Sequence, residues 1–283
     1  MSQHKEQQGF VTFAQNTSTV DYLNLAYLQA LNIKSTQKNN LYAVIVDAAT
    51  KEKINENHRR VFDYIIDLPV DDNRDDSSWK LANERLVFWL TPFKETIKLE
   101  SDLLFTRSID HWWTAFRMKN ICFSHGCKDY TGKQSEVNQY RQMFVDNQLP
   151  DIYNGLMYFR YSKEAMDFFT LADTVYNNWS TVKDQLKNCI EETPSTDVLY
   201  AVTALLYREE QCIVPSLDFI NFVHMKSGIQ GWSDARSWQE TVVAERDGDM
   251  IRINNLNQYS PVHYYDKTYA TKELVEYYES RRA

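Results

Sequence analysis

The sequence is poor in the residues that usually divide or cross-link a chain. It has only 7 glycines, 6 prolines and 4 cysteines among 283 residues, and it contains no linker-like or repeated stretch. We therefore expect a single folding unit, with free thiols in a reducing compartment. Cys122, His125 and Cys127 lie close enough to suggest a zinc site, but no second ligand pair with zinc-like spacing follows them.

Long apolar runs and a positive net charge are also missing. No stretch approaches the ~20 apolar residues that a membrane helix needs, and the N-terminal segment is polar. These features predict a protein of the cytoplasm, or of the host cytoplasm if the source is viral. The formal net charge of −8 disfavours non-specific binding of nucleic acid, although a local basic groove is compatible with it. Oligomeric state is left open.

Aromatic residues, by contrast, are abundant. They form 14% of the chain, with 18 Tyr, 14 Phe and 7 Trp. Most are expected in the core, where large rings bury apolar area. The same rings can stack on sugars or bases, and Trp112 and Trp113 fit either role.

The first hundred residues alternate between strand-like and helix-like patterns. The continuous apolar run at 42–46 predicts a strand buried in a parallel sheet, and residues 10–14 and 94–99 are further strand candidates, with helices between them. This alternation predicts an α/β fold whose ligands bind at the carboxyl ends of the strands. Three polar residues follow such ends, namely Asn16, Asp47 and Asp102.

The second half of the sequence is less regular. Residues 124–152 predict a long polar loop, which is more typical of a functional segment than of an idle connection. A strand at 155–159 precedes a helix capped by Ser162, and a strand at 219–223 is expected to end at His224. Thr271 is expected to cap a last helix.

One acidic motif, Glu100-Ser101-Asp102, follows the strand at 94–99. Carboxylates two residues apart on an extended chain point to the same side. Held close together they repel each other, unless a cation lies near both. A divalent ion held there would bind the diphosphate of a nucleotide. Two acids in a solvated turn would give the same triplet, so the motif alone decides nothing.

The order of motifs over residues 10–235 resembles that of GT-A glycosyltransferases, especially the glycogenin-like and bacterial galactosyltransferase-like enzymes. The resembling elements are the strand exit Thr12 to Asn16, the Asp-x-Asp-like Glu100-Ser101-Asp102, Asn154-Gly155, Thr196-Asp197, and His224 with Lys226 and Trp232. Two departures stand out. The first acid is Glu rather than Asp, and no Lys-Pro-Trp follows His224.

The resemblance implies a GT-A type fold, a mixed and mostly parallel central sheet flanked by helices, with a C-terminal extension. It implies one domain over 1–283, with a nucleotide-sugar-binding half at 1–115, an acceptor-side half at 116–240 and the extension at 241–283. The implied activity is metal-dependent transfer of a hexose or pentose from a nucleotide-diphosphate-sugar donor to an acceptor hydroxyl.

Roles for individual residues follow from the resemblance and from the chemistry. Asp102 and His224 are expected to bind Mn²⁺ or Mg²⁺, with Glu100 as a further ligand or a close neighbour. Lys226 is the expected cation for the diphosphate, and Asp197 the catalytic candidate that holds sugar hydroxyls or acts as base. Further contacts to the nucleotide sugar are expected from Ala14, Gln15, Asn16, Asp47, Arg107, Asn154 and Gly155.

Each of these residues also has a purely structural reading. His224 fits a buried structural histidine, and Lys226 fits a solvated lysine. Asp197 and Asp47 fit carboxylates that stabilise the first turn of a helix.

Two functional alternatives stay open. Glu100, where the family has Asp, also fits a catalytically inactive relative that serves as a binding or structural protein. The acceptor can be a glycan, a small molecule or, as in some bacterial viruses, modified DNA. A DNA acceptor requires a basic groove, for which the candidates are Arg117, Lys119, Lys128 and Lys133.

Overall fold

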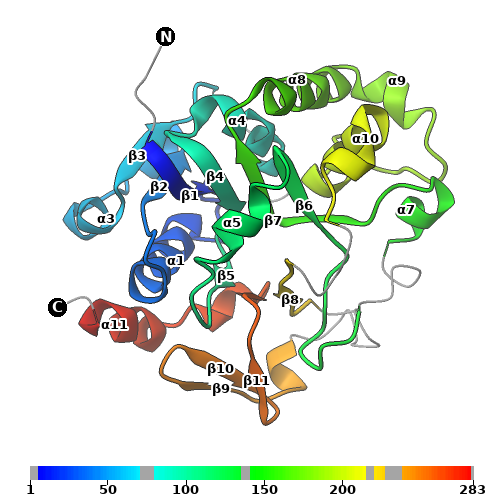
Figure 1. Ribbon diagram of the computed structural model, residues 1–283. Helices are drawn as coiled ribbons and strands as arrows, with labels where there is room; N and C mark the ends of the chain where they lie inside the picture. The colour runs from blue at the N-terminus through cyan, green and yellow to red at the C-terminus, as the bar shows by residue number, and fades with distance from the viewer. Residues whose placement is uncertain (1–5, 71–79, 135–140, 215–219, 227–237, 282–283) are drawn as a thin grey trace.

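The central element of the protein is a six-stranded sheet with the strand order β3-β2-β1-β4-β7-β6 (Figure 1). The computed structural model describes residues 6–70, 80–134, 141–214, 220–226 and 238–281. The six strands are β1 (Glu6–Ala14), β2 (Tyr42–Val46), β3 (Tyr64–Asp67), β4 (Phe93–Leu99), β6 (Ile121–His125) and β7 (Ile152–Arg160). Strands β1 to β4 run parallel, whereas β7 is antiparallel to both of its neighbours.

Helices cover both faces of this sheet. The helical segments are α1 (Tyr22–Thr36), α2 (Ala48–Lys51), α3 (Glu56–Val61), η1 (Lys80–Leu86), α4 (Val87–Leu90), α5 (Trp112–Phe116), α7 (Gln142–Asp146), α8 (Lys163–Asn177), α9 (Trp179–Lys183), α10 (Thr196–Tyr207), η2 (Glu209–Gln211), η4 (Trp238–Glu240), η5 (Lys267–Tyr269) and α11 (Lys272–Ser280). Within the described ranges, no helix combines the length and the apolar character that crossing a bilayer requires.

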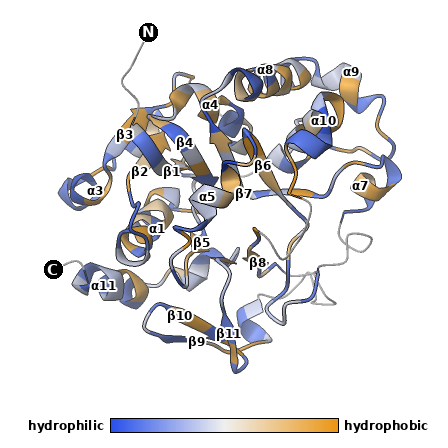
Figure 2. Ribbon diagram, viewed as in Figure 1, coloured by the Kyte–Doolittle hydropathy of each residue, from blue (hydrophilic) through white to orange (hydrophobic). Residues whose placement is uncertain are grey.

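The side chains of β1 show why the sheet is covered on both sides. Phe10 packs in the apolar cluster that contains residues of α1, whereas Val11, the next residue, packs in the cluster of α8 and α10. All five residues of β2 are buried, as the apolar run at 42–46 predicted. Figure 2 shows apolar residues in the central strands and in the helices around them. The predicted α/β class and mostly parallel sheet are therefore confirmed.

The C-terminal extension pairs with earlier parts of the chain in a second, three-stranded sheet, in the order β5-β12-β8. Its strands are β5 (Leu103–Leu104), β12 (Val262–His263) and β8 (Val223–His224). A third sheet is an antiparallel meander of β9 (Ala244–Asp247), β10 (Met250–Ile253) and β11 (Leu256–Gln258). The last helix, α11, lies beside α1 (Figure 1), and Asn32 Nδ2 donates a hydrogen bond of 3.0 Å to the Tyr278 hydroxyl.

Several helix starts agree with the sequence. The side chains of Ser162, Ser195 and Thr271 accept hydrogen bonds from the first turns of α8, α10 and α11. The helical connection between β2 and β3 consists of two short helices, because Asn55 caps a new start at α3. The predicted polar loop at 124–152 contains α7, and its residues 135–140 lie outside the described part. Trp232 and Phe219 also lie outside it.

Candidate functional site

A cavity of about 440 Å³ opens where β4 ends and β7 begins. Parallel strands bring their carboxyl ends to one edge of a sheet, and the antiparallel β7 starts at that same edge. Glu100 N donates a hydrogen bond of 3.1 Å to the carbonyl of Gly155, which joins the two segments. Seven of the predicted site residues line the cavity, namely Glu100, Asp102, Asn154, Gly155, Asp197, His224 and Lys226.

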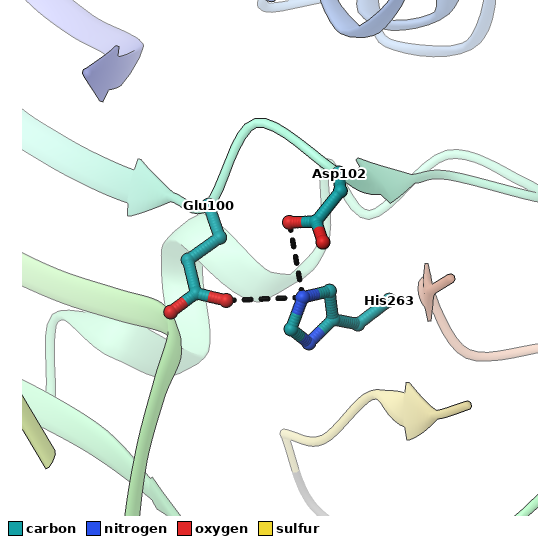
Figure 3. A group of neighbouring side chains, drawn as sticks. All are labelled: Glu100, Asp102 and His263. Carbon is teal, nitrogen blue, oxygen red and sulfur yellow. Dashed lines mark ion pairs between the residues drawn. The ribbon is translucent and has the colours of Figure 1, made fainter. Parts of the chain in front are cut away.

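Two carboxylates and one imidazole meet in this cavity (Figure 3). His263 Nε2 lies 3.0 Å from Glu100 Oε2 and 3.0 Å from Asp102 Oδ1. One ligand atom from each residue lies within 4.8 Å of the other two. Both ring nitrogens of His263 are buried, and Nε2 lies between the two carboxylate oxygens, close to both but not lined up with either one for a hydrogen bond. Sequence analysis did not single out His263.

Pairing between β5 and β12 puts His263 in this place. His263 is opposite Leu103 in β5 and level with His224 in β8. Tyr264 N donates to the carbonyl of Asp102 over 3.0 Å. The segment after His263 is therefore hydrogen-bonded directly to the acidic turn, which is the turn from Glu100 to Asp102 after β4. The turn is also held from α1, where Gln29 Nε2 donates to the carbonyl of Glu100 over 2.6 Å.

Charge in this cluster is balanced within the protein. Burial lowers the pKa of His263, but the Asp102 and Glu100 carboxylates outweigh it and raise the pKa to about 9. Burial raises the pKa of Asp102, yet the charges of His263 and Lys267 hold it well below its usual range. The pKa of Glu100 is lowered in the same way, because the effect of burial is outweighed by His263 and Lys98. His263 is therefore a cation between two anions in the protein without an ion.

Two lysines add positive charge at this end of the cavity. Lys267, from η5, forms an ion pair with Asp102 Oδ2. Its Nζ lies 5.1 Å from the ring centroid of Tyr265, and Lys226 Nζ lies 5.1 Å from the same centroid. Both lysines line the cavity, so anionic groups that enter it meet two ammonium groups, each close to the ring of Tyr265. Lys267 was also not singled out from the sequence.

His224 lies next to the cluster rather than within it. Its ring stacks on that of His263, with centroids 4.6 Å apart and an interplanar angle of 28°. Burial and the neighbouring His263 hold the pKa of His224 well below its ordinary value, so its ring is neutral. That His224 binds a metal stays a prediction; among the described residues, the imidazole that contacts both carboxylates is that of His263.

Asn154 and Asp197 also line the cavity and contact each other. Asn154 N donates to Asp197 Oδ1 over 2.7 Å, and Arg141 Nη2 lies 3.6 Å from Asp197 Oδ2. Burial raises the pKa of Asp197, although Arg141 opposes this rise. A cavity-facing carboxylate at the start of α10 can accept hydrogen bonds from ligand hydroxyls.

The other five predicted site residues do not line the cavity. Asp47 caps α2 through Thr50 N at 2.8 Å and pairs with Lys80 at 3.1 Å. Lys80 also donates to the carbonyl of Asn16 over 3.3 Å, which joins the exits of β1 and β2. Arg107 lies 5.5 Å from the ring centroid of Tyr259, away from the cavity. Nor do Ala14 and Gln15 line it.

Comparison with known proteins gives a fold. No protein-family model matches the sequence, and no curated protein matches it. The galactosyltransferase LgtC, solved with donor and acceptor sugar analogs, superposes with a TM-score of 0.55 at 13% identity and covers 96% of this chain and 95% of its own. The glycosyltransferase GlyE of Streptococcus pneumoniae gives 0.46 at 9%, covering 74% of this chain, and the bifunctional WbbM gives 0.48 at 11%, covering 82%.

This chain spans 45% of the length of GlyE and 41% of that of WbbM. The match to LgtC, by contrast, runs over nearly the whole of both chains. At this identity the likeness establishes the fold, which is that of the GT-A glycosyltransferases. The fold expected from the order of motifs is confirmed.

Without divalent ions, stability should depend on pH through His263. Its pKa of about 9 in the folded protein exceeds the ordinary value of 6.5, so the folded state binds this proton more tightly than the unfolded state. This contribution to stability is complete below pH 6.5 and is lost as the pH rises to 9. Thermal unfolding in EDTA should show a Tm that falls across this window, and His263→Gln should flatten the fall. An equal slope in both proteins would contradict this assignment.

Proposed function

We propose that this protein is a metal-dependent glycosyltransferase that moves a sugar from a nucleotide-diphosphate-sugar donor to an acceptor hydroxyl. The observation that carries the proposal is the cluster of Glu100, Asp102 and His263 in a cavity of about 440 Å³. That cavity lies at the strand ends where α/β proteins bind ligands, in a fold shared with LgtC. The structure of LgtC contains donor and acceptor sugar analogs, which supports the same pair of substrates here.

The cluster fits a divalent cation. Two carboxylates and an imidazole form a mixed oxygen and nitrogen ligand set, which suits Mn²⁺ and also accepts Mg²⁺. His263 Nε2 lies 3.0 Å from an oxygen of each carboxylate, so a divalent ion that took the place of its proton would be held by all three residues. The ion would stabilise the negative charge that develops on the departing nucleoside diphosphate.

The lysines have a complementary task. Lys267 and Lys226 supply fixed positive charge beside the cluster, and a diphosphate held there would be stabilised by both ammonium groups. Lys267 now pairs with Asp102. A cation on Asp102 would replace part of that pairing and leave the amine of Lys267 to a phosphate oxygen.

The donor sugar would occupy the end of the cavity near Asn154, Gly155 and Asp197. There Asp197 would hold sugar hydroxyls or act as base toward the acceptor. The nucleoside would extend toward the exits of β1 and β2, where Ala14, Gln15, Asn16 and Asp47 lie. We assign no ligand contact to Arg107, which lies elsewhere.

Two alternatives have less support. The longer side chain of Glu100, which suggested an inactive relative, still reaches His263 at 3.0 Å, as Asp102 does. Of the four basic residues predicted to form a DNA groove, Arg117 pairs with Glu95, and Lys119 donates to the carbonyls of Glu210 and Ile213. We therefore propose a glycan or small-molecule hydroxyl as the acceptor.

Asp102→Asn should abolish metal-dependent binding of nucleoside diphosphates while leaving the fold intact. Loss of one charged ligand should weaken binding roughly 100-fold or more. Calorimetric titration of UDP, GDP and ADP with and without Mn²⁺ measures this effect. Asp67→Asn is the matched control, because Asp67 ends β3 and pairs with the exposed Lys51. Wild-type protein that binds none of the diphosphates with Mn²⁺ would refute the proposed function.

Lys267→Met should weaken binding of the diphosphate more than binding of the monophosphate. A charged hydrogen bond contributes about 1.5–3 kcal/mol, which corresponds to roughly a 10- to 100-fold loss for the diphosphate. Lys226→Met tests the second lysine in the same titration, and Lys163→Met, on an exposed face of α8, is the control. Equal losses for monophosphate and diphosphate would contradict a contact between Lys267 and the terminal phosphate.

A further inference from the structure

Asn154 lies between two carboxylates, and each carboxylate has a buried cation behind it. Asp197 Oδ1 accepts the main-chain N–H of Asn154 over 2.7 Å, and Glu84 Oε2 accepts its side-chain amide over 2.6 Å. Arg141 lies behind Asp197, and Lys98 forms an ion pair with Glu84. Asp197 was a candidate from the sequence, whereas Glu84 was not.

The pair of Glu84 and Lys98 is almost wholly enclosed. The Lys98 side chain is 0% exposed and that of Glu84 is 3% exposed. Lys98 comes from β4, and its Nζ also lies 3.4 Å from the carbonyl oxygen of Asn154. Glu84, from η1, lines the cavity, whereas Lys98 does not. The carboxylate therefore borders the ligand space, and the cation only supports it from inside the protein.

Stability alone does not account for this pair. Removing a lysine and a glutamate from water costs several kcal/mol for each ion, and apolar side chains of similar volume are often as stable or more so. An interior ion pair at the wall of a cavity is better explained by a need for a carboxylate there. Lys98 then keeps that carboxylate in a fixed position.

Within the described part of the chain, one buried acceptor atom at this place has no hydrogen-bond partner. Asn154 Oδ1 is buried and accepts no hydrogen bond from the described residues. Both contacts to Glu84 use Oε2, which leaves Oε1 as a further acceptor for the cavity. Such acceptors match a ligand that brings hydroxyl donors. Burial raises the pKa of Glu84 to about 7, so above that pH its carboxylate repels a ligand that brings a negative charge.

We propose that Glu84 determines donor specificity by accepting hydrogen bonds from hydroxyls of the donor sugar, with Lys98 as its positioning residue. The preferred donor then carries a neutral, hydroxyl-rich sugar rather than a sugar acid. This inference rests on the proposed function and extends it, because it concerns the sugar alone and not the metal or the diphosphate.

Glu84→Gln tests whether Glu84 contacts the sugar of the donor and not its diphosphate. With Mn²⁺ present, titration with the nucleoside diphosphate that binds the wild type should give an affinity within about twofold of the wild-type value. The corresponding nucleotide sugar should lose roughly 10- to 100-fold in affinity and in kcat/KM, as expected for a hydrogen bond to a charged group. Glu95→Gln is the matched control: Glu95 is also a buried glutamate, paired with Arg117 and outside the cavity lining, so both ligands should bind as before.

The single variant leaves Lys98 buried without its counter-charge, which can unfold the protein. Glu84→Gln/Lys98→Met removes both charges, so that neither is left buried without its counter-charge. Loss of the Lys98 charge near Glu100 affects both ligands alike, and the nucleotide sugar should still lose roughly 10-fold or more in affinity beyond the diphosphate. Sugar acids give a second readout. The wild type should bind UDP-glucose or UDP-galactose more tightly than UDP-glucuronate. The ratio of these affinities should fall in Glu84→Gln or, if that variant unfolds, in the double variant.

Equal losses for the diphosphate and the nucleotide sugar in a folded variant would overturn the inference, because Glu84 would then act on the whole site. Unchanged binding of both ligands, or a wild-type preference for the sugar acid, would overturn it too. A wild type that binds no nucleoside diphosphate would refute the proposed function and this inference together.

Discussion

The repulsion between the Glu100 and Asp102 carboxylates is the constraint on which the rest of the structure depends. Both lie in the turn after β4, where Asp102 is buried and Glu100 is partly buried, so their charges are screened less than at the surface. His263 and Lys267 supply the opposing charge, and both come from a segment about 160 residues later in the chain, as the separation of 165 between Lys267 and Asp102 shows. In the small sheet β5-β12-β8, the strand β12, which contains His263, pairs with β5, which directly follows the turn. This pairing holds the later segment next to the two carboxylates. The C-terminal extension is therefore part of the site.

The cavity lining contains two groups of residues with different chemistry. Glu100, Asp102, His263 and two lysines can hold a cation and the anionic diphosphate. In the second group, Asn154 lies between Glu84 and Asp197, so acceptor oxygens prevail. Such a division suits a donor in which a charged leaving group is joined to a neutral sugar. Electrostatic stabilisation acts on the first part, and hydrogen bonding selects the second.

Local sequence patterns were enough to predict several strands of the central sheet, such as those at 10–14 and 42–46, and part of the site. The apolar run at 42–46 is β2, and Asp102 and Asn154 line the cavity because each lies next to a strand end at the same edge of the sheet. His263 could not be found in this way, because it reaches Asp102 through pairing between β12 and β5, which are far apart in the sequence. The expected imidazole was that of His224, the neighbour of His263 in the paired strand. The sequence did contain one signal for this site: His263 is a second histidine late in the chain, and Lys267 follows it four residues later.

The most direct test of the central claim is the position of the metal ion. A crystal grown with Mn²⁺ and a nucleoside diphosphate, measured at the manganese absorption edge, locates the ion by its anomalous scattering. The account predicts one peak in coordination contact with Glu100, Asp102 and His263, with the diphosphate bound to it. A peak elsewhere, or none while His263 and Lys267 still pair with the carboxylates, would contradict the account.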